Sequence, residues 1–129
     1  MKLNVIISIK PKYVQQILTG KKKYEYRKCI FKKDIDKIYI YSTSPEQKIV
    51  GYFKYAGYIK ETPEKIWNET KEFSGIDEKS YYEYFSKNSY AYAIKIEQIC
   101  VFKVPINPKE KLKKFNPPQS YMYLEGDIH

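Results

Sequence analysis

The chain contains little histidine and cysteine, and these shortages exclude several kinds of chemistry. Its only histidine is His129, so we expect no histidine general base, no Ser–His or Cys–His nucleophile pair and no histidine-bound zinc. Its two cysteines, Cys29 and Cys100, stand far apart and form neither a metal-binding pair nor a redox motif, so we expect reduced thiols. The sequence therefore predicts no metal and no cofactor. Any catalysis would use Lys, Glu, Tyr, Ser or Thr.

Long apolar runs are also missing. No stretch of about 18 apolar residues occurs, and the segment before Pro11 lacks an apolar run of signal-peptide length. We therefore expect a cytoplasmic protein that does not contact a membrane. The length of 129 residues fits one domain, 1–129, with its own core, and leaves the oligomeric state open.

Positive charge, in contrast, is abundant and localised. Residues 1–33 hold ten Lys or Arg and one acid, Glu25, whereas the remaining residues hold fourteen of each sign. The first segment therefore carries the whole net charge of +9. A localised basic patch favours a polyanion such as nucleic acid, and a lysine-rich face that maintains solubility is the alternative. A solubility patch needs no glutamate between two tyrosines, so Glu25 favours a binding site.

The beginning of the chain has clear local signals. Alternating apolar residues predict a strand over residues 3–9, and Pro11 begins a short amphipathic helix that ends before Gly20. The next segment, 21–28, alternates again. Its pattern predicts a strand with Tyr24 and Tyr26 on a packed face and a polar face that consists of Lys23, Glu25 and Arg27.

The rest of the chain predicts further short elements. Strands are expected over 38–41 and 48–58, joined by a hydroxyl-rich turn, and helices over 62–70 and 77–87. We expect these helices to bury aromatic and aliphatic side chains, namely Ile66, Trp67, Tyr81, Tyr84 and Phe85. Two paired strands are expected over 90–96 and 99–104, and an irregular, proline-rich tail from Pro105 onward. This order indicates an α+β domain with a small curved sheet or barrel.

Several motifs resemble a known family. They are Ser8-Ile9-Lys10-Pro11, Ile17-Leu18-Thr19-Gly20-Lys21-Lys22, Tyr24-Glu25-Tyr26-Arg27-Lys28, Tyr41-Ser42-Thr43-Ser44-Pro45, Ile49-Val50-Gly51, Tyr92-Ala93-Ile94 and Pro117-Pro118-Gln119-Ser120-Tyr121. Together they resemble the ASCH domain of the PUA-like superfamily, and in particular the stand-alone prokaryotic members described as predicted transcriptional regulators. The resemblance implies a mixed β-barrel of about five to six strands with flanking short helices. It also implies a cleft beside the barrel that is associated with RNA, DNA or modified nucleosides.

Some members of this family are enzymes. Small amidohydrolases among them deacetylate acetylated cytidine with a Lys, a Thr and a Glu, and the resemblance places that lysine at Lys22. The threonine position falls on Glu25, and a carboxylate held among Lys22, Lys23 and Arg27 is a weak general base. Other relatives are linked to RNA cleavage. Without histidine or a metal cluster, cleavage here would need a Lys or Tyr base.

The candidate nucleic-acid-binding residues are cations, one acid and the hydroxyls of a turn: Lys10, Lys21, Lys22, Lys23, Glu25, Arg27, Ser42, Thr43 and Ser44. The cations could pair with phosphates. Glu25, oriented by Arg27, could accept a hydrogen bond from an exocyclic amine such as that of cytosine. The alternatives are a simple ion pair between Glu25 and Arg27 and a side-chain-capped turn at 42–44.

These observations lead to three hypotheses. The first is a nucleic-acid-binding module, with RNA as the favoured partner and DNA or a modified nucleotide as alternatives. The second is a small enzyme, either an acetylated-cytidine amidohydrolase or a ribonuclease, with Lys22 and Glu25 as catalytic candidates. The third is a protein-interaction module that binds an acidic partner through its basic face.

Overall fold

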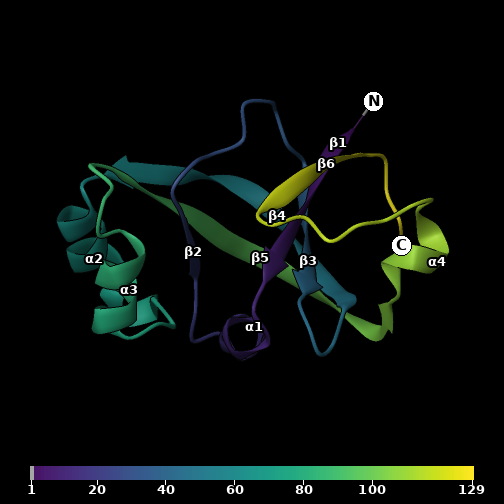
Figure 1. The fold of residues 1–129 in the computed structure, drawn as a ribbon, viewed down its shortest axis with the longest axis horizontal. Coiled ribbons are helices and arrows are strands. Elements are labelled where there is room, and N and C mark those ends of the chain that lie inside the picture. Colours follow the sequence, from purple (N-terminus) through teal and green to yellow (C-terminus); the bar gives the residue numbers. More distant parts are fainter. Residues whose placement is uncertain (1) are drawn as a thin grey trace.

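The computed structural model describes residues 2–129, and its strands form one mixed six-stranded sheet. The elements in chain order are β1 (Leu3–Ile9), α1 (Pro11–Leu18), β2 (Tyr24–Arg27), β3 (Lys37–Ser42), β4 (Lys48–Glu61), α2 (Pro63–Thr70), the 3-10 turn η1 (Lys71–Phe73), α3 (Glu78–Tyr84), β5 (Ala91–Ile106), α4 (Pro108–Lys111) and β6 (Tyr121–Glu125). The strand order is β2-β5-β4-β3-β1-β6. Figure 1 shows α2 and α3 together at one end of the molecule and α4 at the other.

The local signals of the sequence explain the first elements. Residues Val5, Ile7 and Ile9 of β1 pack into one core, and Ile6 packs into another on the opposite face of the sheet. Strand β1 pairs in parallel with β3 and antiparallel with β6, so it lies inside the sheet, and the two cores bury both of its faces. Helix α1 begins at Pro11 as predicted, and the chain leaves it through Gly20, whose φ of 80° favours glycine.

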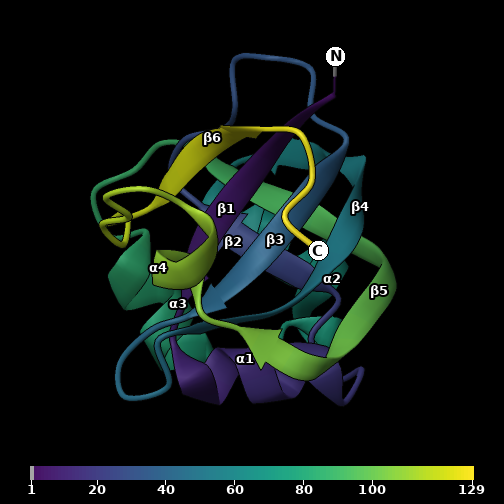
Figure 2. The ribbon, with the colours of Figure 1, turned by 90° about the vertical axis from the view of Figure 1, so that its right-hand side faces the viewer.

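The α+β class with a six-stranded sheet and short helices is confirmed. The sheet curves, as Figure 2 shows, but it is not closed by backbone hydrogen bonds between its edge strands, β2 and β6. One arginine side chain joins the two sides of this gap. Arg27 of β2 donates hydrogen bonds to the Ser8 carbonyl on β1, at 2.7 Å, and to Ser120 Oγ just before β6, at 3.1 Å. We call this gap the seam.

Two predictions about the second half of the chain are wrong. The segments predicted as paired strands form one continuous strand, β5, because Gln98 adopts a positive φ of 52° and the pairing with β4 shifts register, so the strand bends without ending. The tail is not irregular throughout. It contains α4 and β6, and β6 pairs with β1.

The helices bury most of the side chains that were expected. Ile66, Trp67, Tyr81 and Phe85 form one core with Tyr26, Ala91 and Ala93, so β2 and β5 pack against α2 and α3. Tyr84 differs from the prediction: it is 39 % exposed, although Tyr81 before it and Phe85 after it are buried. The described residues, 2–129, contain no helix that is long and apolar enough to cross a bilayer.

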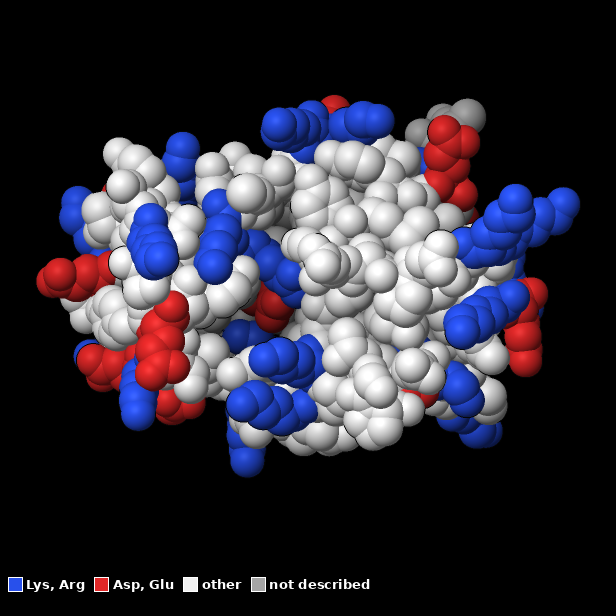
Figure 3. All heavy atoms as spheres, viewed as in Figure 1, with Lys and Arg blue, Asp and Glu red and all other residues white. Residues whose placement is uncertain are grey.

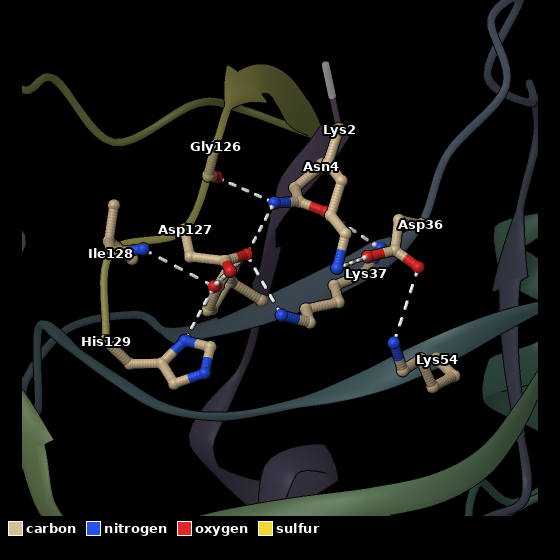
Figure 4. Close-up of polar contacts among 10 residues, drawn as sticks. Lys2, Asn4, Asp36, Lys37, Lys54, Gly126, Asp127, Ile128 and His129 are labelled. Carbon is tan, nitrogen blue, oxygen red and sulfur yellow. Dashed lines mark hydrogen bonds and ion pairs between the residues drawn. The ribbon is translucent and has the colours of Figure 1, made fainter.

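A polar cluster near the first residues of β1 and β3 holds the last residues of the chain in place (Figure 4). The Asp127 carboxylate accepts hydrogen bonds from Lys37 Nζ at 3.0 Å and from Asn4 Nδ2 at 3.2 Å. Tyr39 OH contacts His129 Nδ1 at 2.7 Å, and the His129 ring stacks on Tyr52. The single histidine therefore anchors the chain end.

Candidate functional site

An open cleft of about 850 Å³ lies along the seam. It is lined by the end of β1, the start of α1, strand β2, helix α3, Thr43 and the segment before β6. Figure 3 shows the hollow in the middle of this face, with acidic atoms deep inside and basic atoms around them. The cleft residues with polar or charged side chains are Ser8, Lys10, Lys12, Tyr13, Lys22, Glu25, Tyr26, Arg27, Thr43, Ser80, Tyr81, Glu83, Tyr84, Gln119 and Ser120.

Lys22 is the most unusual group in the cleft because its side chain is only 3 % exposed. Its Nζ donates a hydrogen bond to the Ser74 carbonyl at 2.8 Å and lies over the Tyr26 ring, 4.6 Å from the centroid. Burial disfavours the charged ammonium and lowers the pKa of Lys22 from 10.5 to about 8, although nearby Glu25 favours the charged form. Lys22 therefore stays mostly protonated at pH 7, but its neutral amine is far more populated than that of an exposed lysine.

The lowered pKa of Lys22 predicts a pH dependence of stability. The folded protein loses the Lys22 proton near pH 8, whereas the unfolded chain keeps it until about pH 10.5, so the unfolded state binds more protons between these values. Stability contributed by this group must then rise with pH across that window. Between pH 8 and 9, the wild type should gain about 1 kcal/mol relative to a Lys22→Met variant in urea unfolding. A difference that does not change with pH would show that Lys22 titrates normally.

Glu25 and Arg27 form a buried ion pair on the floor of the cleft. The Glu25 side chain is 9 % exposed and that of Arg27 13 %. Arg27 binds Glu25 Oε2 through Nε at 3.0 Å and through its second terminal nitrogen at 2.8 Å. The other oxygen, Oε1, lies 3.9 Å from Lys22 Nζ, which is too far for a hydrogen bond. The same-face ion pair considered above is therefore present, and it is less exposed than a typical surface pair.

Gly75 explains how Lys22 can be buried. Its φ is 64°, and a Cβ at this position would overlap the Cβ and Cγ of Lys22. We predict that Gly75→Ala lowers the free energy of unfolding by about 2–4 kcal/mol, the sum of backbone strain and the displacement of Lys22. Gly57→Ala is the matched control, because Gly57 also has a positive φ, 94°, but a Cβ there meets nothing within 4 Å. Equal losses in thermal melts of the two variants would contradict the role of this contact.

The structure places the predicted site residues in two groups. Lys10, Lys22, Glu25, Arg27 and Thr43 line the cleft. Lys21, Lys23, Ser42 and Ser44 lie outside its lining. Lys23 Nζ sits over the Phe73 ring at 4.3 Å, Ser42 is fully buried, and Lys21 and Ser44 are exposed.

Sequence reasoning missed cleft residues that come from distant segments. Ser8 and Lys12 flank the predicted Lys10, and Ser80 and Tyr84 come from α3. Gln119 and Ser120 belong to the Pro-Pro-Gln-Ser-Tyr motif, so the motif itself was the signal that could have identified them. Within residues 2–129, no group of three or more His, Cys, Asp or Glu is arranged to hold a metal ion.

Comparisons with known proteins agree with this architecture. The ASCH domain model matches residues 7–100. The chain is 27 % identical to an ASCH domain-containing ribonuclease of Zymomonas mobilis, over 95 % of this chain and 84 % of that protein. It is also 28 % identical to a protein named ATP synthase subunit alpha from Ureaplasma parvum, over 96 % of this chain but only 16 % of that protein.

Solved structures show the same fold. The crystal structure of ASCH from Zymomonas mobilis superimposes with a TM-score of 0.87 at 26 % identity, covering 95 % of this chain and 87 % of that chain. A variant of that protein with a tyrosine replaced by phenylalanine gives a TM-score of 0.86 at 25 % identity, covering 95 % and 90 %. Since the family model covers most of the sequence and the fold agrees over nearly all of it, this chain belongs to the ASCH domain family.

Proposed function

We propose that this chain binds single-stranded RNA in the cleft and cleaves it, with Lys22 as the group that accepts a proton. The observation that carries this proposal is a buried lysine with a pKa of about 8 beside a carboxylate, on the floor of an open cleft. Perturbed titratable groups in clefts are characteristic of catalytic sites. The relative that is named a ribonuclease aligns with 95 % of the chain, which supports the same activity.

The rim of the cleft suits a phosphate backbone. Lys10 and Lys12 are exposed lysines that line the opening, and they are separated by one residue at the start of α1. Such side chains attract phosphates and release counterions, so RNA affinity should fall steeply as salt increases. The cations supply affinity for any sequence, because phosphate contacts carry no base information.

Glu25 supplies the means to select a base. Its Oε2 is occupied by Arg27, whereas Oε1 has no hydrogen bond at 3.5 Å or less from Lys22. Oε1 can therefore accept a hydrogen bond from an exocyclic amine, as in cytosine or adenine, and uracil lacks this donor. Arg27 holds the carboxylate in place and is a positioning residue.

The reaction uses the neutral Lys22 amine and the hydroxyl that distinguishes RNA from DNA. Lys22 Nζ takes the proton of a ribose 2′-hydroxyl, and the 2′-oxygen forms a bond to the adjacent phosphorus. The bond from phosphorus to the 5′-oxygen breaks, and the leaving oxygen takes a proton from water. The hydroxide so formed takes up the proton that Lys22 accepted, which restores the neutral amine. The products are a 2′,3′-cyclic phosphate and a 5′-hydroxyl. No group beyond the amine and solvent is needed to balance this step.

The experiment compares labelled single-stranded RNA with matched DNA and 2′-O-methyl RNA of the same sequence at two salt concentrations. We expect all three to bind at low salt, and only the RNA to be cut, giving cyclic-phosphate ends. Binding without scission would leave a binding module and overturn the cleavage step. Acetylated cytidine is included as a substrate, because its deacetylation without strand scission would replace the ribonuclease by an amidohydrolase. If none of the three oligonucleotides binds, the whole proposal is overturned.

A further inference from the structure

The face of β2 that carries Glu25 and Arg27 continues across the neighbouring strands. Arg27 pairs with Tyr92 of β5, and Tyr92 pairs with Lys60 of β4. Directly paired residues in an antiparallel sheet point to the same face, so these three side chains form one row. In the next row, Glu25 pairs with Ile94, and Ile94 pairs with Tyr58. The sheet thus leads from the cleft to a group of tyrosines.

Three tyrosines and one lysine make up this surface, which we name the tyrosine strip: Tyr58, Lys60, Tyr90 and Tyr92. Lys60 Nζ lies 5.0 Å from the centroid of the Tyr90 ring and 5.6 Å from that of Tyr92. The rings of Tyr58 and Tyr92 meet edge to face at 5.5 Å. One ammonium group therefore sits among the aromatic rings.

The strip is exposed in a protein that buries most of its large apolar side chains. Tyr58 is 43 % exposed and Tyr90 is 53 % exposed, while core tyrosines such as Tyr39 and Tyr81 are fully buried. Tyr84 is an exposed tyrosine of the cleft lining, and Lys28 Nζ lies over its ring, 4.6 Å from the centroid. Aromatic rings associated with lysines thus occur both in the cleft and on the strip.

We propose that the tyrosine strip binds the nucleotides that flank the one held in the cleft, and that its partner is single-stranded RNA. Unpaired bases stack on exposed aromatic rings whatever their identity, and a nearby cation pairs with the phosphate backbone. The strip supplies both, with Tyr58 and Tyr90 as stacking surfaces and Lys60 as the cation. This inference rests on the proposed function, since it extends the same binding site.

The connection of the strip to the cleft favours RNA over an acidic protein segment. The adjacent acid on β4, Glu61, points to the opposite face of the strand from Lys60, as alternation requires, and lies 4.0 Å from Lys65. The strip therefore presents a cation among rings without an acid in its own row. A protein partner would need no connection to the cleft, whereas the rows from Arg27 and Glu25 connect the strip to it directly.

The test measures the affinity of 2′-O-methyl oligoribonucleotides, which lack the attacking hydroxyl, at two lengths. A dinucleotide fills the cleft alone, and an octanucleotide also reaches the strip. We expect the octanucleotide to bind more tightly, and Tyr58→Ala, Tyr90→Ala and Lys60→Ala each to weaken it, the tyrosine variants roughly ten-fold. None of the three should change the affinity of the dinucleotide.

Phe73→Ala is the matched control, because Phe73 is 42 % exposed and also lies beneath a lysine, Lys23, but belongs to neither the strip nor the cleft lining. It should not change the affinity of either oligonucleotide. If the wild type binds both lengths with equal affinity, the proposed role of the tyrosine strip is overturned, while RNA binding in the cleft still stands. Strip variants that lose affinity for both lengths equally, or that match the control, would also overturn it. Failure of the wild type to bind either length would instead overturn the proposed function.

Discussion

Lys22→Met should reduce the cleavage of single-stranded RNA by about 10²–10⁴-fold, the range that a positioned proton acceptor contributes. Methionine has an unbranched side chain of similar length, so it preserves the packing beneath Gly75 but cannot accept a proton. RNA affinity should change little, because the proposed phosphate contacts come from the exposed lysines of the rim and not from the buried Lys22. The measurements are single-turnover cleavage rates and equilibrium binding of the 2′-O-methyl analogue.

The pH profile provides a second readout for Lys22. The wild-type rate should rise with pH, pass through half of its maximum near pH 8, where half of the Lys22 population is neutral, and level off at higher pH. The residual rate of the variant should lack this inflection. Lys103→Met serves as the control, because Lys103 is an exposed lysine outside the cleft and its loss removes the same charge. Cleavage by Lys22→Met at the wild-type rate would exclude Lys22 as the base.

Arg27→Met should have the largest effect on stability, lowering the free energy of unfolding by about 3–5 kcal/mol. The variant leaves the buried Glu25 carboxylate without the guanidinium that contacts its Oε2, and it removes the hydrogen bonds to Ser8 and Ser120 across the seam. Arg27→Lys should not restore stability, because an ammonium group cannot reproduce the planar set of donors. Chemical denaturation checks both variants.

Adding Glu25→Gln to Arg27→Met distinguishes the two causes of this loss. If an unpaired charge dominates, the double variant should regain about 1–2 kcal/mol relative to Arg27→Met. Lys21→Met is the control, since Lys21 is exposed and its loss should change stability by no more than about 0.5 kcal/mol. A loss of that small size in Arg27→Met would mean that the seam contacts contribute little.

Elements with strong local signals could be predicted from the sequence. Strand β1 follows from alternation, α1 from Pro11 and Gly20, and α2 from Thr62, whose side chain accepts a hydrogen bond from the Lys65 amide. Strand β6 could not be found in this way. It is stabilised by pairing with β1, more than 110 residues away, so its residues show their role only once β1 is placed beside them.

The candidate site shows the same division. The family resemblance pointed to Lys22, but nothing in the local sequence distinguishes its chemistry from that of Lys21 and Lys23. The structure supplies the physical difference, because Ser74 and Gly75 come from a loop about 50 residues later and cover the Lys22 side chain. Burial by a distant loop, rather than any property of the lysine itself, lowers its pKa.

The open seam has a consequence for motion. The strands that form opposite walls of the cleft, β1 and β2, share no backbone hydrogen bonds and are linked across it by the Arg27 side chain. The walls can therefore separate by breaking side-chain contacts alone, while every strand pairing of the sheet stays intact. A ligand that contacts both walls would hold them together and oppose this separation. Amide hydrogen exchange in β2 should then slow when such a ligand binds, although no new secondary structure forms.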